Sequence, residues 1–317
     1  MKNYDVVALG LAVMDILAAP VDKSLFEHDK TPVNSIILAP GGDAANQATH
    51  LARLGWRTAL SCRLGNDALS RMFAAEMAAY GVDLSHSATS DESVMTAAIV
   101  LVAADGQRSI LHRRSNNFDF CIEDVDMDVI ADTRVLTVGS IYGCPRLEED
   151  GLEQILVHAK RNGVMTFADM ATDKKRQKLN GLQTFLPHID WFVPSEVDSL
   201  HLTDGLGCED AAQAFLDAGA KNVIIKLGER GAYAHCAGFK GYVPAFSINA
   251  VDTTGSGDAF CAGLIHSLLN GRSTAEALEF ASACGAYSAL CMGAATAKLS
   301  QTTITEFIKT NHKTADF

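Results

Sequence analysis

The sequence predicts an α/β protein with a mostly parallel central sheet that helices cover on both faces. Apolar segments typical of buried strands alternate with segments of helical spacing along most of the 317 residues, as expected for consecutive β-α-β units. Parallel strands need such helical crossovers, which then cover the sheet. The length and the hydrophobic fraction of 48% suffice for a substantial core. We expect one domain over residues 1–317.

The first expected strand is the buried run YDVVALG, residues 4–10. A helix follows over residues 43–55, because the segment opens on a capping residue, repeats apolar residues at helical spacing and closes on glycine. The strand RTALSCRLG and a second glycine-terminated helix over residues 68–81 come next. The pattern then continues with the strands RVLTVGS, VMTFADM, DWFVPS and KNVIIKLG and with helices over residues 147–162, 174–185 and 211–219. After Asp252 we expect only helices, over residues 257–270, 273–290 and 303–311.

Two stretches break this alternation, approximately residues 12–40 and 93–114. Both resemble strands joined by short turns, and the ADG between two apolar runs of the second stretch is a hairpin signal. Strands without intervening helices are expected to form a small antiparallel sheet outside the main body. That sheet could extend an edge of the central sheet or form a lid over a cleft.

Composition excludes several classes of protein. The net charge of −12, with no run of basic residues, argues against a nucleic-acid partner. No apolar stretch is long enough to cross a membrane, and the N-terminus does not resemble a secretory signal, so we expect a cytoplasmic protein with no membrane partner. The eight cysteines are scattered without a C-x-x-C pair, and no H-x-x-x-H pair occurs. Neither a disulfide framework nor a zinc site is expected.

The segment AVDTTGSGDAF, residues 250–260, carries the most informative chemistry. It places the amide groups of Gly255, Ser256 and Gly257 at the start of an apolar helix, where unpaired N–H groups and the helix dipole favour a phosphate or oxyanion. Asp258 lies in the first turn of that helix. It could be a simple helix cap, or a base that takes a proton from an acceptor hydroxyl beside the anion. The helix dipole is expected to lower the pKa of Asp258 and keep it ionised.

Competing motifs are absent or poorly matched. The sequence contains no G-x-x-x-x-G-K-[ST], and Gly10 is followed by LAVMD rather than by the glycines of a dinucleotide-binding turn. In GSIYG, residues 139–143, the serine lies one position away from that of a nucleophile elbow.

Two segments in this order resemble the signatures of one family. DTTGSGDAF is similar to the C-terminal signature of the ribokinase-like (PfkB) carbohydrate kinases, and GGDAANQATHLARLG followed by RLGND is similar to their N-terminal signature. The resemblance covers essentially the whole chain. It implies a ribokinase-like three-layer sandwich with a small β-sheet lid, and an ATP-dependent sugar kinase that uses Mg²⁺ and can bind a monovalent cation such as K⁺. It also implies a homodimer formed through the lid.

The resemblance also implies roles for individual residues. Asp258 corresponds to the catalytic base, and Gly255, Ser256 and Gly257 to the anion hole. Sugar hydroxyls are expected at Asp15, Gly41, Gly42 and Asn46, and the nucleotide at Ser195, Lys226, Gly228, Gly231, Ser282 and Gly285. Asp252 and Thr254 match the loop that holds a monovalent cation, and Asp198 could order water around magnesium.

Two segments depart from the family pattern. The usual N-x-x-E motif is replaced by SEVD, residues 195–198, and the usual D-x-N-x-R by DMATD, which starts at Asp169 and lacks the arginine. Arg108, Arg113 and Arg114 near the expected lid could bind the carboxylate of a sugar acid, with Arg108 as the candidate, or could lie on a solvated strand edge. A nucleoside kinase of the same superfamily and a catalytically weak sugar-binding sensor remain alternatives to a kinase acting on a sugar or sugar acid.

Overall fold

The computed structural model describes residues 2–104, 107–113, 115–171, 173 and 177–314, apart from the side chain of Arg108. Its centre is a nine-stranded sheet in the order β15-β14-β13-β12-β11-β10-β1-β4-β6. In that order the strands are Phe239–Val243, Ala232–Cys236, Asn222–Lys226, Trp191–Phe192, Met165–Met170, Thr133–Ile141, Tyr4–Gly10, Thr58–Ser61 and Val82–Asp83. Neighbours from β13 to β6 are parallel, whereas β14 and β15 are antiparallel. The predicted mostly parallel sheet is confirmed.

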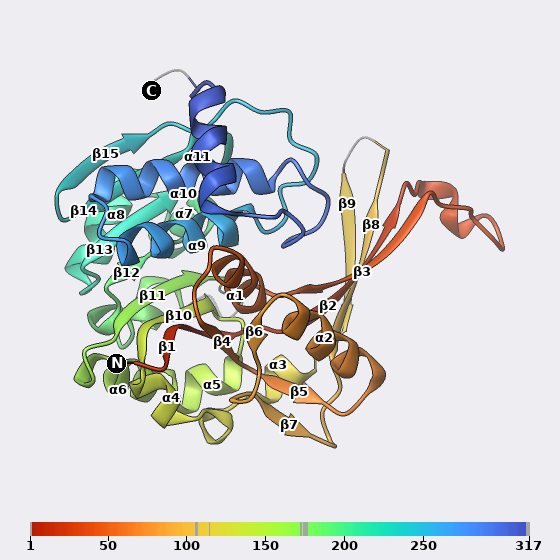
Figure 1. Ribbon diagram of the computed structural model, residues 1–317, viewed down its shortest axis with the longest axis horizontal. Coiled ribbons are helices and arrows are strands. Elements are labelled where there is room, and N and C mark those ends of the chain that lie inside the picture. Colours follow the sequence, from red (N-terminus) through yellow and green to blue (C-terminus); the bar gives the residue numbers. More distant parts are fainter. Residues whose placement is uncertain (1, 105–106, 114, 172, 174–176, 315–317) are drawn as a thin grey trace.

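Helices cover both faces of this sheet and complete a three-layer α/β sandwich (Figure 1). Consecutive strand residues point to opposite faces, so Val6 packs with one helical layer and Val7 with the other. The first layer contains α1 (Asp43–Arg53), α2 (Ala68–Ala79), α9 (Ser256–Leu269) and α10 (Thr274–Ser288), with α11 (Gln301–Thr310) packed outside α10. The second contains α4 (Met127–Ala131), α5 (Pro145–Asp150), α6 (Leu152–Arg161), α7 (Glu196–Leu202) and α8 (Cys208–Asp217).

A separate four-stranded sheet lies to one side of the main body (Figure 1). Its strands run in the order β3-β2-β8-β9, with bounds Ser35–Gly41, Val13–Ala19, Thr96–Val102 and Arg108–Arg113. The two hairpins are antiparallel, but the central pair, β2 and β8, is parallel. The expectation of an antiparallel sheet is therefore wrong for its centre. The inner strands of the two hairpins, β2 and β8, run in the same direction. A turn motif predicts the pairing within one hairpin but not the direction in which two hairpins pair.

Three expected elements also differ from the structure. The helix predicted over residues 147–162 is interrupted at Gly151, where a Cβ would lie 2.4 Å from the Cβ of Ile122. Of the helix predicted over residues 174–185, the described part forms a 3₁₀ turn, η3 (Lys178–Leu182), and residues 174–176 lie outside the described part. The strand predicted over residues 57–65 divides into β4 and β5 (Arg63–Gly65), which pairs with β7 (Ala88–Ser90).

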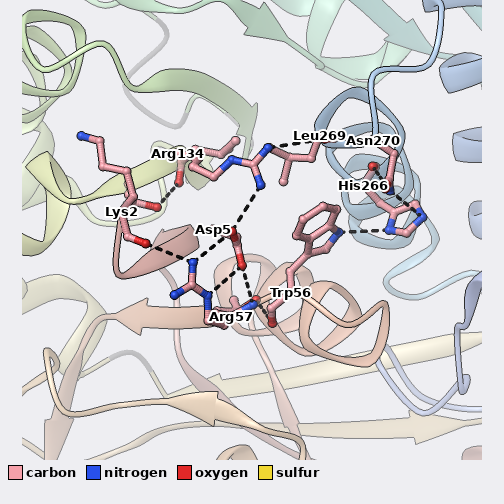
Figure 2. Close-up of polar contacts among 11 residues, drawn as sticks. Lys2, Asp5, Trp56, Arg57, Arg134, His266, Leu269 and Asn270 are labelled. Atoms are coloured by element: carbon pink, nitrogen blue, oxygen red, sulfur yellow. Dashed lines mark hydrogen bonds and ion pairs between the residues drawn. The ribbon is translucent and has the colours of Figure 1, made fainter.

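A polar network fastens α9 to the amino-terminal edge of the central sheet (Figure 2). Asp5 at the start of β1 accepts hydrogen bonds from Arg57 and from Arg134. The Trp56 indole Nε1 donates to Nδ1 of His266, near the end of α9, over 3.0 Å. With its far end anchored here, α9 presents its first turn at the opposite, carboxyl-terminal edge of the strands. In the described part of the chain, no helix has the length and apolar character needed to span a membrane.

Candidate active site

The first turn of α9 forms the centre of the site. Gly255 caps the helix with a φ of +73°, and a Cβ there would lie 2.1 Å from the carbonyl oxygen of Ala294. Only glycine fits this turn without displacing the neighbouring backbone. Ser256 and Gly257 line a cavity at the start of α9, and the Ser256 amide donates to the Thr253 carbonyl over 3.2 Å. Helix starts of this kind attract anions, and an anion site at this turn stays a prediction.

Asp258 lies in that first turn and is only 6% exposed. Two amides of α1 donate hydrogen bonds to its carboxylate: Asn46 Nδ2 to Oδ2 over 2.9 Å, and Gln47 Nε2 to Oδ1 over 3.3 Å. Gln47 is itself oriented by Thr137, whose hydroxyl donates to Gln47 Oε1 over 2.6 Å. The structure thus brings Asp258 together with the predicted Asn46, and adds Gln47 and Thr137 as residues that fix the carboxylate in place.

The pKa of Asp258 differs from the sequence expectation. Burial raises it well above its ordinary value, and repulsion from Asp43 and then Asp169 raises it further. The hydrogen bond from Asn46 and the charge of Lys226 act in the opposite direction without cancelling this shift. The expectation that the helix dipole would lower this pKa is wrong, because burial and neighbouring carboxylates outweigh a dipole worth about 1 kcal/mol. Asp258 is consequently a stronger base than a surface aspartate.

The predicted acceptor-binding residues gather where β2, β3 and the start of α1 meet. Asp15 on β2 lies against Gly41, at which a Cβ would be 2.1 Å from Asp15 Oδ2. Gly42 caps α1 with a φ of +93°, and a Cβ there would lie 2.7 Å from the Leu11 carbonyl oxygen. Burial raises the pKa of Asp15 to about 6, and repulsion from Asp252 adds to the shift. Carboxylate and amide groups placed in this way suit the hydroxyls of a small polar molecule.

Asp43 was not predicted as a site residue, although it lies within the GGDAAN segment. It is the first residue of α1, and Ser140 at the carboxyl end of β10 donates its hydroxyl to Asp43 Oδ2. Burial raises the pKa of Asp43 to about 7, with repulsion from Asp169 as the next cause. An acid that directly follows two glycines at a helix start was the available signal, but this reads equally well as a helix cap.

A cavity of about 820 Å³ extends outward from the first turn of α9. Every residue predicted to bind the nucleotide lines it: Ser195, Lys226, Gly228, Gly231, Ser282 and Gly285. Its wall includes the apolar side chains of Phe246, Ile248 and Ala286 together with Ser256 and Gly257 of the helix start. Apolar side chains and a helix start in one cavity suit a nucleotide with its base and phosphates.

The altered SEVD segment, whose Ser195 lines the cavity, forms the start of α7. Ser195 caps this helix, accepting a hydrogen bond from the Asp198 amide over 3.1 Å while its hydroxyl donates to the Asp198 carboxylate. Burial raises the pKa of Asp198 despite these hydrogen bonds, and repulsion from Asp169 adds to the rise. Asp169 is paired with Lys226. These side chains form an acidic group around one lysine.

The residues predicted to hold a monovalent cation lie in the loop before α9. Asp252 Oδ1 accepts hydrogen bonds from the Thr254 amide and hydroxyl over 2.9 and 2.6 Å, and Asp252 Oδ2 accepts one from the Gly293 amide over 2.9 Å. These hydrogen bonds hold Asp252 and Thr254 together, and their role in binding a monovalent cation stays a prediction. Within the described residues, however, no group of three or more His, Cys, Asp or Glu side chains is arranged to hold a metal ion.

The arginines predicted near the acceptor are placed only in part. The side chain of Arg108 and the whole of Arg114 lie outside the described residues. Arg113 is exposed at the end of β9.

Comparison with known proteins identifies the class to which this site belongs. A model of the pfkB family of carbohydrate kinases matches residues 3–301, so the chain belongs to this family. Fructokinase-1 of Oryza sativa subsp. japonica is 29% identical over 305 residues, which cover 91% of this chain and 93% of that protein. Ribokinase of Haemophilus influenzae is 30% identical over 264 residues, with 81% and 83% covered. Both of these relatives are sugar kinases, and this chain belongs with the pfkB family of carbohydrate kinases, which are phosphotransferases.

Solved structures agree with the observed fold. An E. coli chain assigned as a ribokinase II, solved in complex with ATP and Mg²⁺, superposes with a TM-score of 0.85 at 24% identity. The match covers 96% of this chain and 99% of that one. The predicted ribokinase-like sandwich is thereby confirmed.

Proposed function

We propose that this protein transfers the γ-phosphoryl group of ATP to a hydroxyl of a sugar or sugar acid, with Asp258 as the catalytic base. The observation that carries the proposal is the position of Asp258. Its buried carboxylate is fixed by Asn46 and Gln47 next to an anion-binding turn. Phosphoryl transfer needs both parts, donors for the transferred group and a positioned acceptor base.

The reaction follows from this arrangement. Asp15, Gly41, Gly42 and Asn46 hold the acceptor so that one hydroxyl faces Asp258. As the hydroxyl oxygen bonds to the γ-phosphorus, its proton passes to the Asp258 carboxylate, and the bond between that phosphorus and the β–γ bridging oxygen breaks. ADP leaves with the electron pair of that bond. The amides of the Gly255–Gly257 turn stabilise the negative charge of the transferring group.

Two cations fit the proposal. Magnesium supplies neutralisation of phosphate charge when it is bound, and it usually keeps several waters and few protein ligands. Asp169 and Asp198 contact Lys226 and Ser195 of the cavity wall, and these two carboxylates would hold its waters. The E. coli structure of the same fold was solved with ATP and Mg²⁺, which supports ATP and Mg²⁺ as ligands here. Asp252 and Thr254 would hold K⁺ beside the anion-binding turn.

The small sheet completes the proposed catalytic unit as a lid. It carries Asp15 on β2 and lies next to the start of α1. Closing it over a bound acceptor would exclude water, which otherwise competes for the phosphoryl group. Ile36, Leu38, Ile99 and Leu111 on one face of this sheet are at least 40% exposed, and we propose that a second copy of the chain covers them in a homodimer.

The decisive experiment measures ADP release with ATP, Mg²⁺ and K⁺ across sugars, sugar acids and nucleosides, for the wild type and for Asp258→Asn. We expect turnover on a sugar or sugar acid, and a loss of about 10²–10⁴-fold in kcat for the variant with little change in acceptor binding. Asp210→Asn is the matched control, because Asp210 occupies the corresponding position in α8, three residues after a capping glycine.

The possible outcomes separate the alternatives. Turnover only on nucleosides would replace the acceptor class with that of a nucleoside kinase. Acceptor binding without ADP release in any assay would instead indicate a sensor. Full turnover by a folded Asp258→Asn variant would remove Asp258 as the base.

A further inference from the structure

Lys226 occupies an unusual position for a surface-type side chain. It is the last residue of β13, its side chain is 16% exposed, and it lines the 820 Å³ cavity. Its ammonium nitrogen lies against the anion-binding turn, since a Cβ on Gly257 would be only 3.1 Å away. The backbone holds the residue firmly, because the Lys226 amide donates to the Pro194 carbonyl over 2.9 Å.

The partner of Lys226 is Asp169, near the end of β11. The two side chains form an ion pair, and Asp169 is itself only 6% exposed, with its second oxygen accepting a hydrogen bond from the Met170 amide over 2.8 Å. Burial alone would lower the pKa of Lys226, but attraction to Asp169 and Asp258 raises it above its ordinary value. Lys226 is therefore charged, and Asp169 holds that charge at the turn.

Few other cations could face a phosphate in this cavity. Of the described residues that line it, Lys226 and Arg230 are basic, and Arg230 is half exposed and paired with Glu196. Neither DMATD, residues 169–173, nor SEVD, residues 195–198, contains a basic side chain. A polyanion entering beside Asp169, Asp198 and Asp258 needs a positive charge at the turn, and Lys226 supplies one.

We propose that Lys226 contacts the terminal phosphoryl group of the nucleotide and stabilises it during transfer, and that Asp169 is the positioning residue that keeps the ammonium group at the anion-binding turn. This inference rests on the proposed function for the identity of the nucleotide, and specifies which phosphate the lysine contacts. A lysine that merely balanced a buried acid would not distinguish a triphosphate from a diphosphate.

The test compares the affinities for Mg·AMP-PNP, a non-hydrolysable ATP analogue, and Mg·ADP by titration calorimetry. We expect Lys226→Met to lower the affinity for Mg·AMP-PNP by about 10–100-fold, which is the effect of losing a charge-assisted hydrogen bond. The affinity for Mg·ADP should fall by less than about 3-fold. The matched control is Lys221→Met, since Lys221 directly precedes β13 and also pairs with an aspartate, Asp190. That control should leave both affinities unchanged.

Removing Lys226 leaves Asp169 buried without its partner, so the single variant could fail to fold. The doubly neutral variant Lys226→Met/Asp169→Asn avoids this and should show the same selective loss of AMP-PNP. Made alone, Asp169→Asn should lower the ratio of AMP-PNP affinity to ADP affinity. Made together with Lys226→Met, it should not lower that ratio further. A role for Asp169 in folding alone would give no such dependence.

The inference is overturned if Lys226→Met, or the double variant, binds both nucleotides normally or loses both equally. This test does not depend on whether the proposed function is correct. If the wild type phosphorylates no acceptor, the ratio of nucleotide affinities still decides the role of Lys226. If sugar phosphorylation is found and the ratio is unchanged, only the inference about Lys226 fails.

Discussion

Asp43 and Asp258 belong to the first turns of α1 and α9, two helices that meet at the carboxyl edge of the central sheet. Asp43 is the strongest charged contributor to the raised pKa of Asp258. Because a base acts only when deprotonated, we expect kcat/KM to fall with decreasing pH as Asp258 takes up a proton. That fall should begin at a higher pH than for an ordinary carboxylate.

Asp43→Asn tests this coupling. The change removes a negative charge that disfavours ionised Asp258, so the pKa of Asp258 decreases and the acidic limb of the kcat/KM profile moves to lower pH. The measurement is a pH–rate profile for the wild type and the variant, with Asp210→Asn as a control that should leave the limb in place. If the acidic limb of the kcat/KM profile stays at the same pH in Asp43→Asn, Asp43 does not affect the protonation of Asp258.

Some residues of the site could be predicted from the sequence and others could not. Asp258 and Asn46 were predicted from two signatures, and the hydrogen bond between them joins these distant segments. Gln47 was missed because nothing local distinguishes a buried amide from a solvated one in a helix. The direction of the Asp258 pKa was predicted wrongly because a dipole can be inferred from one helix, whereas burial depends on segments that fold against it.

At the scale of an element, α9 depends on glycine at both of its ends for different reasons. Gly255 and Gly271 share a φ of +73°, but a Cβ on Gly271 would meet no atom within 4 Å. We expect Gly271→Ala to cost about 1–2 kcal/mol from left-handed strain alone. Gly255→Ala should cost more, and should reduce kcat at least tenfold, because it also displaces the anion-binding turn from Ala294. Urea unfolding and kcat measure the two effects, and equal losses in both variants would contradict this account.

The far end of α9 is expected to make stability pH-dependent. Trp56 can only donate, so Nδ1 of the buried His266 must be unprotonated to accept its hydrogen bond, and Nε2 carries the proton toward Gln301, 2.7 Å away. Burial lowers the pKa of His266 in the folded protein. The unfolded state then binds the proton more readily, so stability is lost as pH falls below about 6.5, by at most about 1.4 kcal/mol per pH unit.

Denaturant unfolding at pH 7 and pH 5 measures this effect. His266→Gln should lose less stability between the two values than the wild type does, while His28→Gln, at an exposed site, should behave as the wild type. If all three proteins lose the same stability between pH 7 and pH 5, groups other than His266 cause the pH dependence.

Elements as a whole were predicted better than their interruptions. The helices α1, α2, α9 and α10 follow from spacing, caps and terminal glycines. The break at Gly151 does not, because a glycine inside a helical pattern weakens the helix without requiring it to end. The packing of Gly151 against Ile122 depends on a segment distant in sequence.

At the scale of the whole molecule, the small sheet presents an apolar row across one face. Leu38, Ile16, Ile99 and Leu111 are aligned through the pairing of β3, β2, β8 and β9, and Leu111 is 60% exposed. We expect Leu111→Lys to convert a homodimer into monomers in sedimentation experiments, because it places a charge in the proposed interface. Val197→Lys, a change at an apolar site on α7 that is 75% exposed, should leave the dimer intact. A monomeric wild type would refute the proposed assembly.

The parallel pairing of β2 with β8 carries a consequence for the order in which the chain folds. Val13 pairs with Thr96, and the residues between the two hairpins build α1, α2 and strands of the main body. Closing so long a loop is entropically costly until the intervening segment is packed. We expect the small sheet to form last during refolding and to open first in the native state, which pulsed hydrogen exchange would detect as late and weak protection of β2 and β8. As the proposed lid, such a sheet would open repeatedly while the sandwich beneath it stays folded.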